Sequence, residues 1–409
     1  MKKFKKINHI GKPEIKAVTK VLQSGILSDY VGDSSKNFEG GKYVRKFENN
    51  IKKYFNVRYA ITVNSWTSGL NCAVGSLDIE PGDEIILSPW TMSACATSIL
   101  MWNAIPVFAD IEYDYFTICP KSIEKKITNK TKAIMAIDIF GQSCDMYAIN
   151  KIAKKYKLKV ISDSAQAIGS KYFNNYSGTI SDIGGFSFNY HKHIHTGEGG
   201  VILTNSKLLS RKLKLLRNHG ESALSKNEKN KLIYLNNMIG NNYRLGEIEC
   251  AIGIEQLKKL KKILKRRAFI AKKFDKFFDN FKGLTIPMIR PGSTHVYYAY
   301  PLIYNENITR VKRDIVFDEL KKNGLPVAKN YELLHYKPLF QNMIAYGNKR
   351  FPWSLNNKKY NYQKGICPNA EKHQHNTFLG ISMCIHEYSN KDIENIFKIF
   401  EKVWKKLKI

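Results

Sequence analysis

Apolar residues follow two different spacings between residues 47 and 204. Short apolar runs of strand length alternate with segments whose apolar positions recur every three or four residues. The runs predict strands over 59–63, 84–87, 106–110, 133–139, 159–163 and 200–204, with a further strand-like segment that ends near Ser187. The recurring segments predict helices over 47–55, 68–77, 120–127 and 146–156. Repeated strand–helix units of this kind predict an α/β fold with a mostly parallel sheet between helices.

The pattern changes after Gly253. A long basic helix over about 247–281 leads to a strand-like segment, 296–302, and then to a helix near 311–323. An irregular aromatic stretch, 331–362, precedes a final helix over 390–406. We therefore expect a large domain over residues 1–255, with the N-terminal helix included, and a smaller α+β domain over residues 256–409. No low-complexity linker separates them, so the two should pack tightly.

Composition and cysteine usage point to a cytoplasmic globular protein. Hydrophobic residues make up 43% of the 409 positions. The seven cysteines are scattered without C-x-x-C pairs, which fits a reducing compartment. The basic N-terminus has no apolar segment behind it, so no signal peptide is expected. The uncharged run 85–109 is interrupted by prolines and hydroxyl residues, so it predicts two strands and a short helix rather than a membrane span.

The net charge of +31 raises the question of a nucleic-acid partner. Its two densest clusters, 257–267 and 402–408, repeat their apolar positions at helical spacing and carry lysines on the outer faces. Lysine is abundant throughout the chain, so solvated helix faces account for the charge and no nucleic-acid partner is expected. A diffuse positive field would still attract an anionic small substrate.

Lys192 has the most distinctive surroundings of any lysine in the chain. It lies between the apolar segment that ends near Ser187 and a glycine-rich turn, Thr196–Gly200, which leads into the 200–204 strand. Partial burial removes solvation from an ammonium group, so we expect a lowered pKa and a nucleophilic amine. Such an amine can form a Schiff base with an aldehyde cofactor.

Other polar groups stand at the carboxyl ends of predicted strands, where α/β sheets bind ligands. The segment Asn64–Gly69 offers hydroxyl groups and a helix N-terminus to a phosphate, although ordinary helix capping explains it as well. Asp163 ends the 159–163 strand and could pair with a protonated pyridine nitrogen, with helix capping again the alternative. A polar loop, Gly240–Leu245, precedes the long basic helix. Together with Lys192, this order of groups predicts a cofactor site.

The order of these segments resembles the DegT/DnrJ/EryC1/StrS family of sugar aminotransferases. The resemblance extends from residues 38–42 to residues 367–371, and its most specific part is the spacing from Ser187 to Lys192 followed by Thr-Gly-Glu-Gly-Gly. It implies the fold type I architecture, with a seven-stranded sheet, and pyridoxal 5'-phosphate (PLP) as cofactor. It also implies a homodimer with shared active sites.

The family resemblance also implies roles for individual residues. Lys192 would form the Schiff base with the cofactor and act as the catalytic acid and base, while Asp163 would pair with the pyridinium nitrogen. Gln166 would lie near the ring hydroxyl. The phosphate would be held by Thr67, Ser68 and Ser187, and by Asn242 reaching into the partner subunit's site.

The chain departs from the family pattern at two places. Trp66 stands where the phosphate loop usually has glycine, and tryptophan cannot follow every backbone conformation open to glycine. The aromatic residue that usually stacks on the ring is replaced in Ser88-Pro89-Trp90-Thr91-Met92. Met92 is favoured slightly over Trp90 for covering the ring.

The implied function is transfer of an amino group from an amino acid, by family habit glutamate, to a keto-sugar. The acceptor would be linked to a nucleotide and would serve surface polysaccharide or glycan synthesis. Some family members carry histidine in place of the lysine and act as sugar dehydratases, but counting five residues from Ser187 gives Lys192. Amination of a smaller keto-phosphate and a non-catalytic nucleic-acid-binding relative are further alternatives.

A metal site is the alternative from a different class of chemistry. His191, His193 and His195 alternate and would share one face if this segment were a strand. No carboxylate or cysteine accompanies them at ligand spacing, so no metal is expected.

Overall fold

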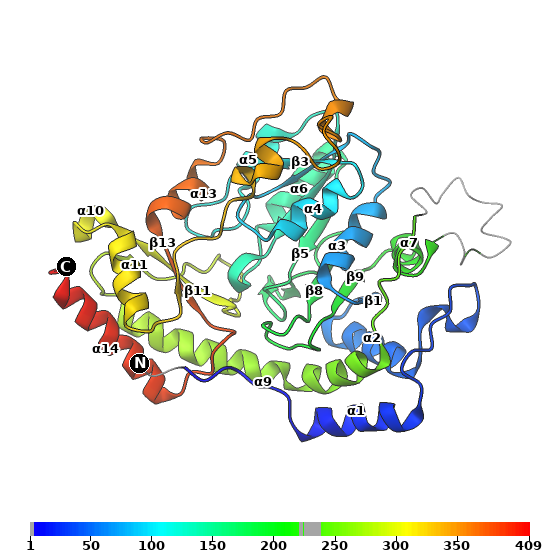
Figure 1. Ribbon diagram of the computed structural model, residues 1–409, viewed down its shortest axis with the longest axis horizontal. Coiled ribbons are helices and arrows are strands. Elements are labelled where there is room, and N and C mark those ends of the chain that lie inside the picture. The colour runs from blue at the N-terminus through cyan, green and yellow to red at the C-terminus, as the bar shows by residue number, and fades with distance from the viewer. Residues whose placement is uncertain (1–3, 221–223, 225–238) are drawn as a thin grey trace.

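The computed structural model describes residues 4–220, 224 and 239–409. Within these residues, the centre is a sheet of seven strands in the order β1-β9-β8-β5-β4-β2-β3 (Figure 1). The strands are β1 (Tyr59–Val63), β2 (Glu84–Leu87), β3 (Ile105–Phe108), β4 (Thr131–Ile137), β5 (Lys159–Asp163), β8 (Ile183–Ser187) and β9 (Gly200–Thr204). Among these described strands, β9 alone runs antiparallel to its neighbours, β1 and β8. The predicted α/β class and mostly parallel sheet are confirmed.

Helices cover both faces of the seven-stranded sheet. One face carries α3 (Trp66–Gly75), α4 (Ser93–Leu100) and α7 (Lys207–Arg217). The other carries α2 (Lys42–Phe55), α5 (Pro120–Lys126), α6 (Met146–Tyr156) and the first half of α9 (Glu247–Phe278). Alternate residues of a strand point to opposite faces, so Met135 and Ile134 of β4 belong to different cores. This burial on both faces explains why the strands form continuous apolar runs in the sequence.

A smaller antiparallel sheet, in the order β10-β11-β13-β12, forms the second part of the molecule. Its strands are β10 (Leu284–Thr285), β11 (Ala299–Tyr304), β12 (Val327–Ala328) and β13 (Phe378–Ser382). It packs against α11 (Arg313–Lys322), α14 (Asn390–Lys406) and the second half of α9. In Figure 1, α9 runs beneath the large sheet and on to the smaller one. The proposed boundary between residues 255 and 256 falls inside this helix and remains a prediction.

The N-terminal segment contacts both parts of the molecule. Ile7 N donates to Ile385 O at 3.0 Å, so the first described residues lie beside the smaller sheet. Helix α1 (Lys12–Ser24) then packs along α9.

Short elements complete the described chain. They are η1 (Lys36–Glu39), η2 (Ile139–Gly141), β6 (Lys171–Tyr172), β7 (Asn175–Tyr176), α10 (Glu306–Thr309), η5 (Leu334–Tyr336), α12 (Pro338–Gln341), η6 (Trp353–Leu355), α13 (Pro368–Lys372) and η7 (His373–Thr377). The predicted strand–helix–strand order of residues 85–109 is confirmed as β2, α4 and β3. No helix in the described part of the chain combines the length and apolar character of a membrane span.

One local prediction is wrong, and the condition on which the metal alternative depends is not met. The segment predicted as a strand from residue 296 enters β11 only at Ala299, because Val296 N and Tyr298 N donate to the carbonyls of Gly141 and Phe140 instead. The histidines at 191, 193 and 195 do not share a strand face, because residues 190–194 form turns and bends.

Two buried histidines predict how stability depends on pH. Burial lowers the pKa of both His193 and His295 from 6.5 to about 3. At each of these two residues the unfolded chain takes up a proton that the native protein does not as pH falls below 6.5, and each residue lowers the free energy of unfolding by about 1.4 kcal/mol per pH unit. We expect His193→Gln to reduce the slope of unfolding free energy against pH between 6.5 and 4.5, measured by denaturant titration. An unchanged slope in His193→Gln would contradict this expectation.

Candidate active site

Three parallel strands end at the same edge of the large sheet, and each brings a polar residue there. Asn64 follows β1, Asp163 is the last residue of β5, and Ser187 is the last residue of β8. A cavity of 190 Å³ lies at this edge. Its walls include six of the eight predicted site residues: Thr67, Met92, Asp163, Gln166, Ser187 and Lys192.

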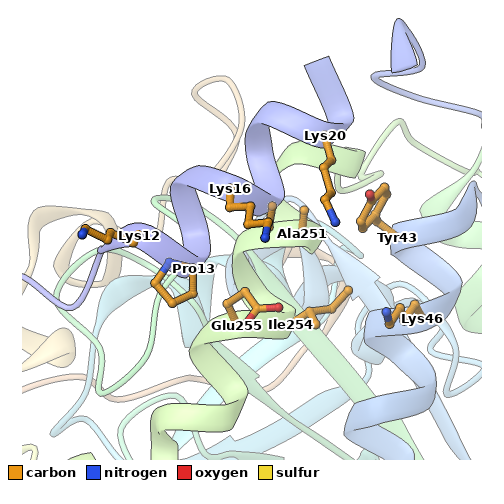
Figure 2. A pocket seen from close by; sticks show the side chains of 10 residues that line it. Lys12, Pro13, Lys16, Lys20, Tyr43, Lys46, Ala251, Ile254 and Glu255 are labelled. Carbon is orange, nitrogen blue, oxygen red and sulfur yellow. The ribbon is translucent and has the colours of Figure 1, made fainter. Parts of the chain in front are cut away.

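A larger hollow of 480 Å³ lies between α1, α2 and α9. Figure 2 shows Lys12, Lys16, Lys20 and Lys46 around it. These four side chains are exposed. Exposed lysines can attract an anion, but they do not shield a reacting group from water. The cavity beside Lys192 is lined by buried polar side chains, so it is the candidate active site.

Lys192 is buried, as the sequence predicts, with 9% of its surface exposed. Desolvation by burial lowers the pKa of its amine below the usual 10.5, although Asp163 acts in the opposite direction. Its Nζ lies 4.6 Å from the centre of the Tyr298 ring. Burial therefore favours the neutral amine, which can act as a nucleophile and as a base, while the Tyr298 ring covers one side of it.

The glycine-rich turn after Lys192 depends on backbone angles that favour glycine. Gly197 has φ of 90° and Gly199 has φ of 152°. A Cβ at Gly199 would also come within 2.5 Å of Thr196 Oγ1. These angles allow the chain to pass from the loop of Lys192 directly into β9.

Asp163 is buried and accepts three hydrogen bonds from protein groups. Its Oδ1 accepts from Trp66 Nε1 at 2.7 Å and from Ala165 N at 3.0 Å. Its Oδ2 accepts from Cys95 Sγ at 3.0 Å. Each carboxylate oxygen can accept about two hydrogen bonds, so Oδ2 retains capacity for a donor from the cavity.

The start of α3 contributes to the wall of the cavity. Ser65 caps this helix, with its Oγ accepting from Ser68 N at 3.0 Å. The exposed Thr67 lines the cavity, and the first-turn N–H groups of a helix favour an anion. The Ser68 hydroxyl instead donates to Asn64 Oδ1 at 2.6 Å and does not line the cavity. The structure therefore brings Thr67, but not the Ser68 side chain, to this wall.

Trp66 is compatible with the backbone of the phosphate loop. It is the first residue of α3 and is not among the residues with positive φ. The loop needs no glycine at this position, and the indole turns inward to a buried site with 5% exposure.

Met92 and Trp90 occupy different environments. Trp90 is fully buried among aromatic side chains that include Phe116 and Phe378. Met92 is 60% exposed and lines the cavity. Of these two candidates for covering a bound ring, Met92 is the one beside the cavity.

Gln166 is fixed by two neighbours. Its Oε1 accepts from Phe140 N at 2.9 Å, and its Nε2 donates to Tyr331 OH at 3.3 Å. The amide has a second N–H, which remains for a group in the cavity.

Asn242 lies outside the cavity of its own subunit. Its side chain is exposed and its Oδ1 accepts from Arg244 Nε at 2.7 Å. Its carbonyl accepts from Asn64 Nδ2 at 3.5 Å, beside the phosphate loop. A role for Asn242 in the partner subunit's site remains a prediction.

Several residues of the cavity wall carry no distinctive sequence signal, among them Cys95, Asn189, Tyr298 and Tyr331. Cys95 stands in the sequence as one of the apolar positions of a buried helix. Tyr298 follows Tyr297, which adopts a φ of 52°, and no sequence pattern reveals its contact with Lys192. Tyr331 begins the aromatic stretch and, like other aromatic residues of that stretch, packs against the large core.

The three alternating histidines make separate contacts. His193 is buried and its Nε2 lies 2.9 Å from Val296 O. His195 N donates to Gln256 Oε1 at 3.4 Å, while His191 lines the cavity. The described residues contain no group of three His, Cys, Asp or Glu side chains that could hold a metal ion.

The walls of the cavity fit an aromatic aldehyde that carries a phosphate. They include the first turn of α3 with Thr67, the Lys192 side chain and the Asp163 carboxylate. Asn189 Oδ1 is buried and has no partner among the described residues, so this wall offers a further polar contact.

Comparisons with known proteins agree with this site. The model of the DegT/DnrJ/EryC1/StrS aminotransferase family matches residues 8–377. The chain is 30% identical to GDP-perosamine synthase of Vibrio cholerae, over 86% of this chain and 92% of that protein. It is 34% identical to the UDP-4-amino-4,6-dideoxy-N-acetyl-beta-L-altrosamine transaminase of Campylobacter jejuni, over 81% of this chain and 83% of the other.

A solved structure extends the similarity to three dimensions. PseC of Helicobacter pylori, an aminotransferase involved in the biosynthesis of pseudoaminic acid, superposes with a TM-score of 0.81 at 28% identity. The superposition covers 99% of this chain and all of that chain.

Proposed function

Because the chain belongs to the DegT/DnrJ/EryC1/StrS aminotransferase family, we propose that it transfers the amino group of glutamate to a nucleotide-linked keto-sugar at the cavity beside Lys192. The protein is an aminotransferase whose cofactor is PLP. The donor and the acceptor are parts of the proposal. The observation that carries it is the meeting of a buried lysine, a buried carboxylate and a helix N-terminus in one cavity.

The amine of Lys192 is proposed as the group that moves the proton. When bound, PLP supplies an aldehyde that links to amines and a ring that accepts the electron pair left at a carbon that has lost its proton. A lowered pKa gives Lys192 Nζ a larger neutral fraction than an exposed lysine has. The neutral amine can take a proton from the donor's α-carbon and deliver it to the carbon that carried the cofactor's aldehyde. The same amine then reverses these steps with the acceptor.

The other cavity residues would hold and orient the cofactor. Asp163 Oδ2, which among the contacts of the described residues accepts only from Cys95, would accept from the protonated ring nitrogen, and the carboxylate charge would keep that nitrogen protonated. Thr67, Ser187 and the start of α3 would bind the phosphate, with Ser68 acting through its capping contacts in α3. Met92 would cover one face of the ring, and the second N–H of Gln166 would reach the ring hydroxyl.

A homodimer and a cytoplasmic location belong to the same proposal. Asn242 is exposed beside the phosphate loop, where a second subunit could receive it. All seven cysteines are free, which fits a reducing compartment.

Dehydration of a sugar is the alternative within the family. The residue five positions after Ser187 is lysine, and its amine lines the cavity. The neighbouring His193 cannot replace it, because its ring is buried against Val296 O. These contacts favour amino transfer.

A substrate screen tests the proposed function. Purified protein with PLP is incubated with glutamate and, separately, with GDP-linked and UDP-linked keto-sugars and simple keto-phosphates, and products are identified by mass. We expect 2-oxoglutarate and an aminated nucleotide-sugar in equal amounts. If only the keto-phosphates are aminated, the proposed nucleotide-linked acceptor is wrong. If a sugar loses water and gains no amino group, the protein is a dehydratase.

A further inference from the structure

Trp66 makes a polar contact that the proposed function does not yet use. Its indole Nε1 donates to Asp163 Oδ1 at 2.7 Å, and both side chains are buried. A hydrogen bond from a neutral donor to a buried carboxylate is shorter and stronger than one between neutral groups. Trp66, which stands where the family's loop usually has glycine, therefore contacts the carboxylate of Asp163.

The surrounding backbone leaves room for the indole. A Cβ at Gly69, one turn further along α3, would come within 2.6 Å of the Trp66 ring. A Cβ at Gly185, the β8 residue that pairs with Asp163, would come within 2.1 Å of it. The ring therefore lies between α3 and β8, with its N–H directed at Asp163 of β5.

The three hydrogen bonds to Asp163 are distributed unequally over its two carboxylate oxygens. Oδ1 receives the indole N–H and the Ala165 N–H, which fill its usual capacity. Oδ2 receives only the Cys95 thiol, a weak donor, among the contacts of the described residues. Burial and the nearby carboxylate keep Cys95 protonated by raising its pKa well above 9.0.

We infer that Trp66 is a positioning residue that holds Asp163 by Oδ1, so that Oδ2 faces the ring nitrogen of the cofactor. This inference rests on the proposed role of Asp163. Without the indole N–H, Oδ1 retains only the Ala165 N–H, so the carboxylate is held less firmly and its charge loses one stabilising donor. The ring nitrogen would then be protonated in a smaller fraction of molecules.

The test compares Trp66→Phe with wild type. PLP affinity is measured by titration of the apoprotein, and ring-nitrogen protonation by the ¹⁵N chemical shift of labelled PLP across a pH series. We expect the affinity of Trp66→Phe for PLP to be about tenfold weaker than that of wild type. We also expect its ring nitrogen to lose its proton at a lower pH than the ring nitrogen in wild type does. Benzothienylalanine at Trp66 retains the bicyclic shape without the N–H and should give the same result if phenylalanine impairs folding.

Two controls separate positioning from packing. Trp102→Phe removes an indole donor that bonds Asn71 instead of Asp163, so it should leave the nitrogen signal unchanged. In an Asp163→Ala background, Trp66→Phe should produce no further change in that signal. A wild-type nitrogen signal and affinity in both Trp66 variants would overturn the inference, whereas a wild-type protein that binds no PLP would overturn the proposed function itself.

Discussion

Replacing Lys192 with alanine is expected to abolish amino transfer while the protein still binds PLP. The change removes the only lysine that lines the cavity among the described residues, and with it the proposed attachment point and the proposed group that moves the proton. Loss of a general acid–base and of the attachment step together should lower kcat by at least about 10⁴-fold. Single-turnover mixing with glutamate, followed by absorbance, measures this directly.

A second buried lysine provides the matched control. Lys212 in α7 is also buried, but its amine pairs with Asp78 away from the cavity. Lys212→Met should retain activity in whatever fraction of the protein folds. A small primary amine added to the Lys192→Ala variant should restore part of the rate, because it supplies the missing base. Turnover at the wild-type rate in that variant would refute the assignment of Lys192.

Replacing Asp163 with asparagine is expected to give the next largest loss. Asparagine retains the shape and can accept from Trp66, but it carries no charge to hold the ring nitrogen in its protonated form. We expect kcat to fall by about 10²–10³-fold with a smaller change in PLP affinity, as for loss of one strong electrostatic contact in a buried site. Steady-state kinetics and PLP titration of the same preparation separate the two effects.

Asp138 provides the control for this substitution. It follows the neighbouring strand β4, is fully buried and accepts from Ser164 and Cys144, outside the walls of the cavity. Burial raises its pKa to about 7, so Asp138→Asn removes less charge near neutral pH. Its kcat should stay within about tenfold of wild type, and an equal loss in both variants would mean that the Asp163 effect is structural.

The sequence predicted the architecture well because the central strands are buried on both faces. The strands at 59–63, 84–87, 159–163 and 200–204 have the predicted bounds, as does the helix at 390–406. Each of these segments is either a continuous apolar run or a regular amphipathic repeat, and such patterns indicate one type of secondary structure clearly. The strand expected from residue 296 begins later, because the N–H groups of Val296 and Tyr298 donate hydrogen bonds to the carbonyls of Gly141 and Phe140.

The candidate site was predicted less completely for a physical reason. Lys192, Asp163 and Ser187 stand at strand ends or beside a glycine turn, so local sequence marks them. Contacts across the fold leave no such mark: Tyr298 lies over Lys192, and Cys95 and Trp66 both reach Asp163. Trp66 was recognised only as a departure from the family pattern, and its partner became visible in three dimensions.

The central claim is that the buried amine of Lys192 carries the cofactor in a site built for amino transfer. Borohydride reduction of the PLP-loaded protein, followed by digestion and mass spectrometry, locates the attachment. The account predicts cofactor on the peptide that contains Lys192, and a loss of this adduct when glutamate is added before reduction. Attachment at a different lysine, or an adduct that glutamate leaves unchanged, would contradict it.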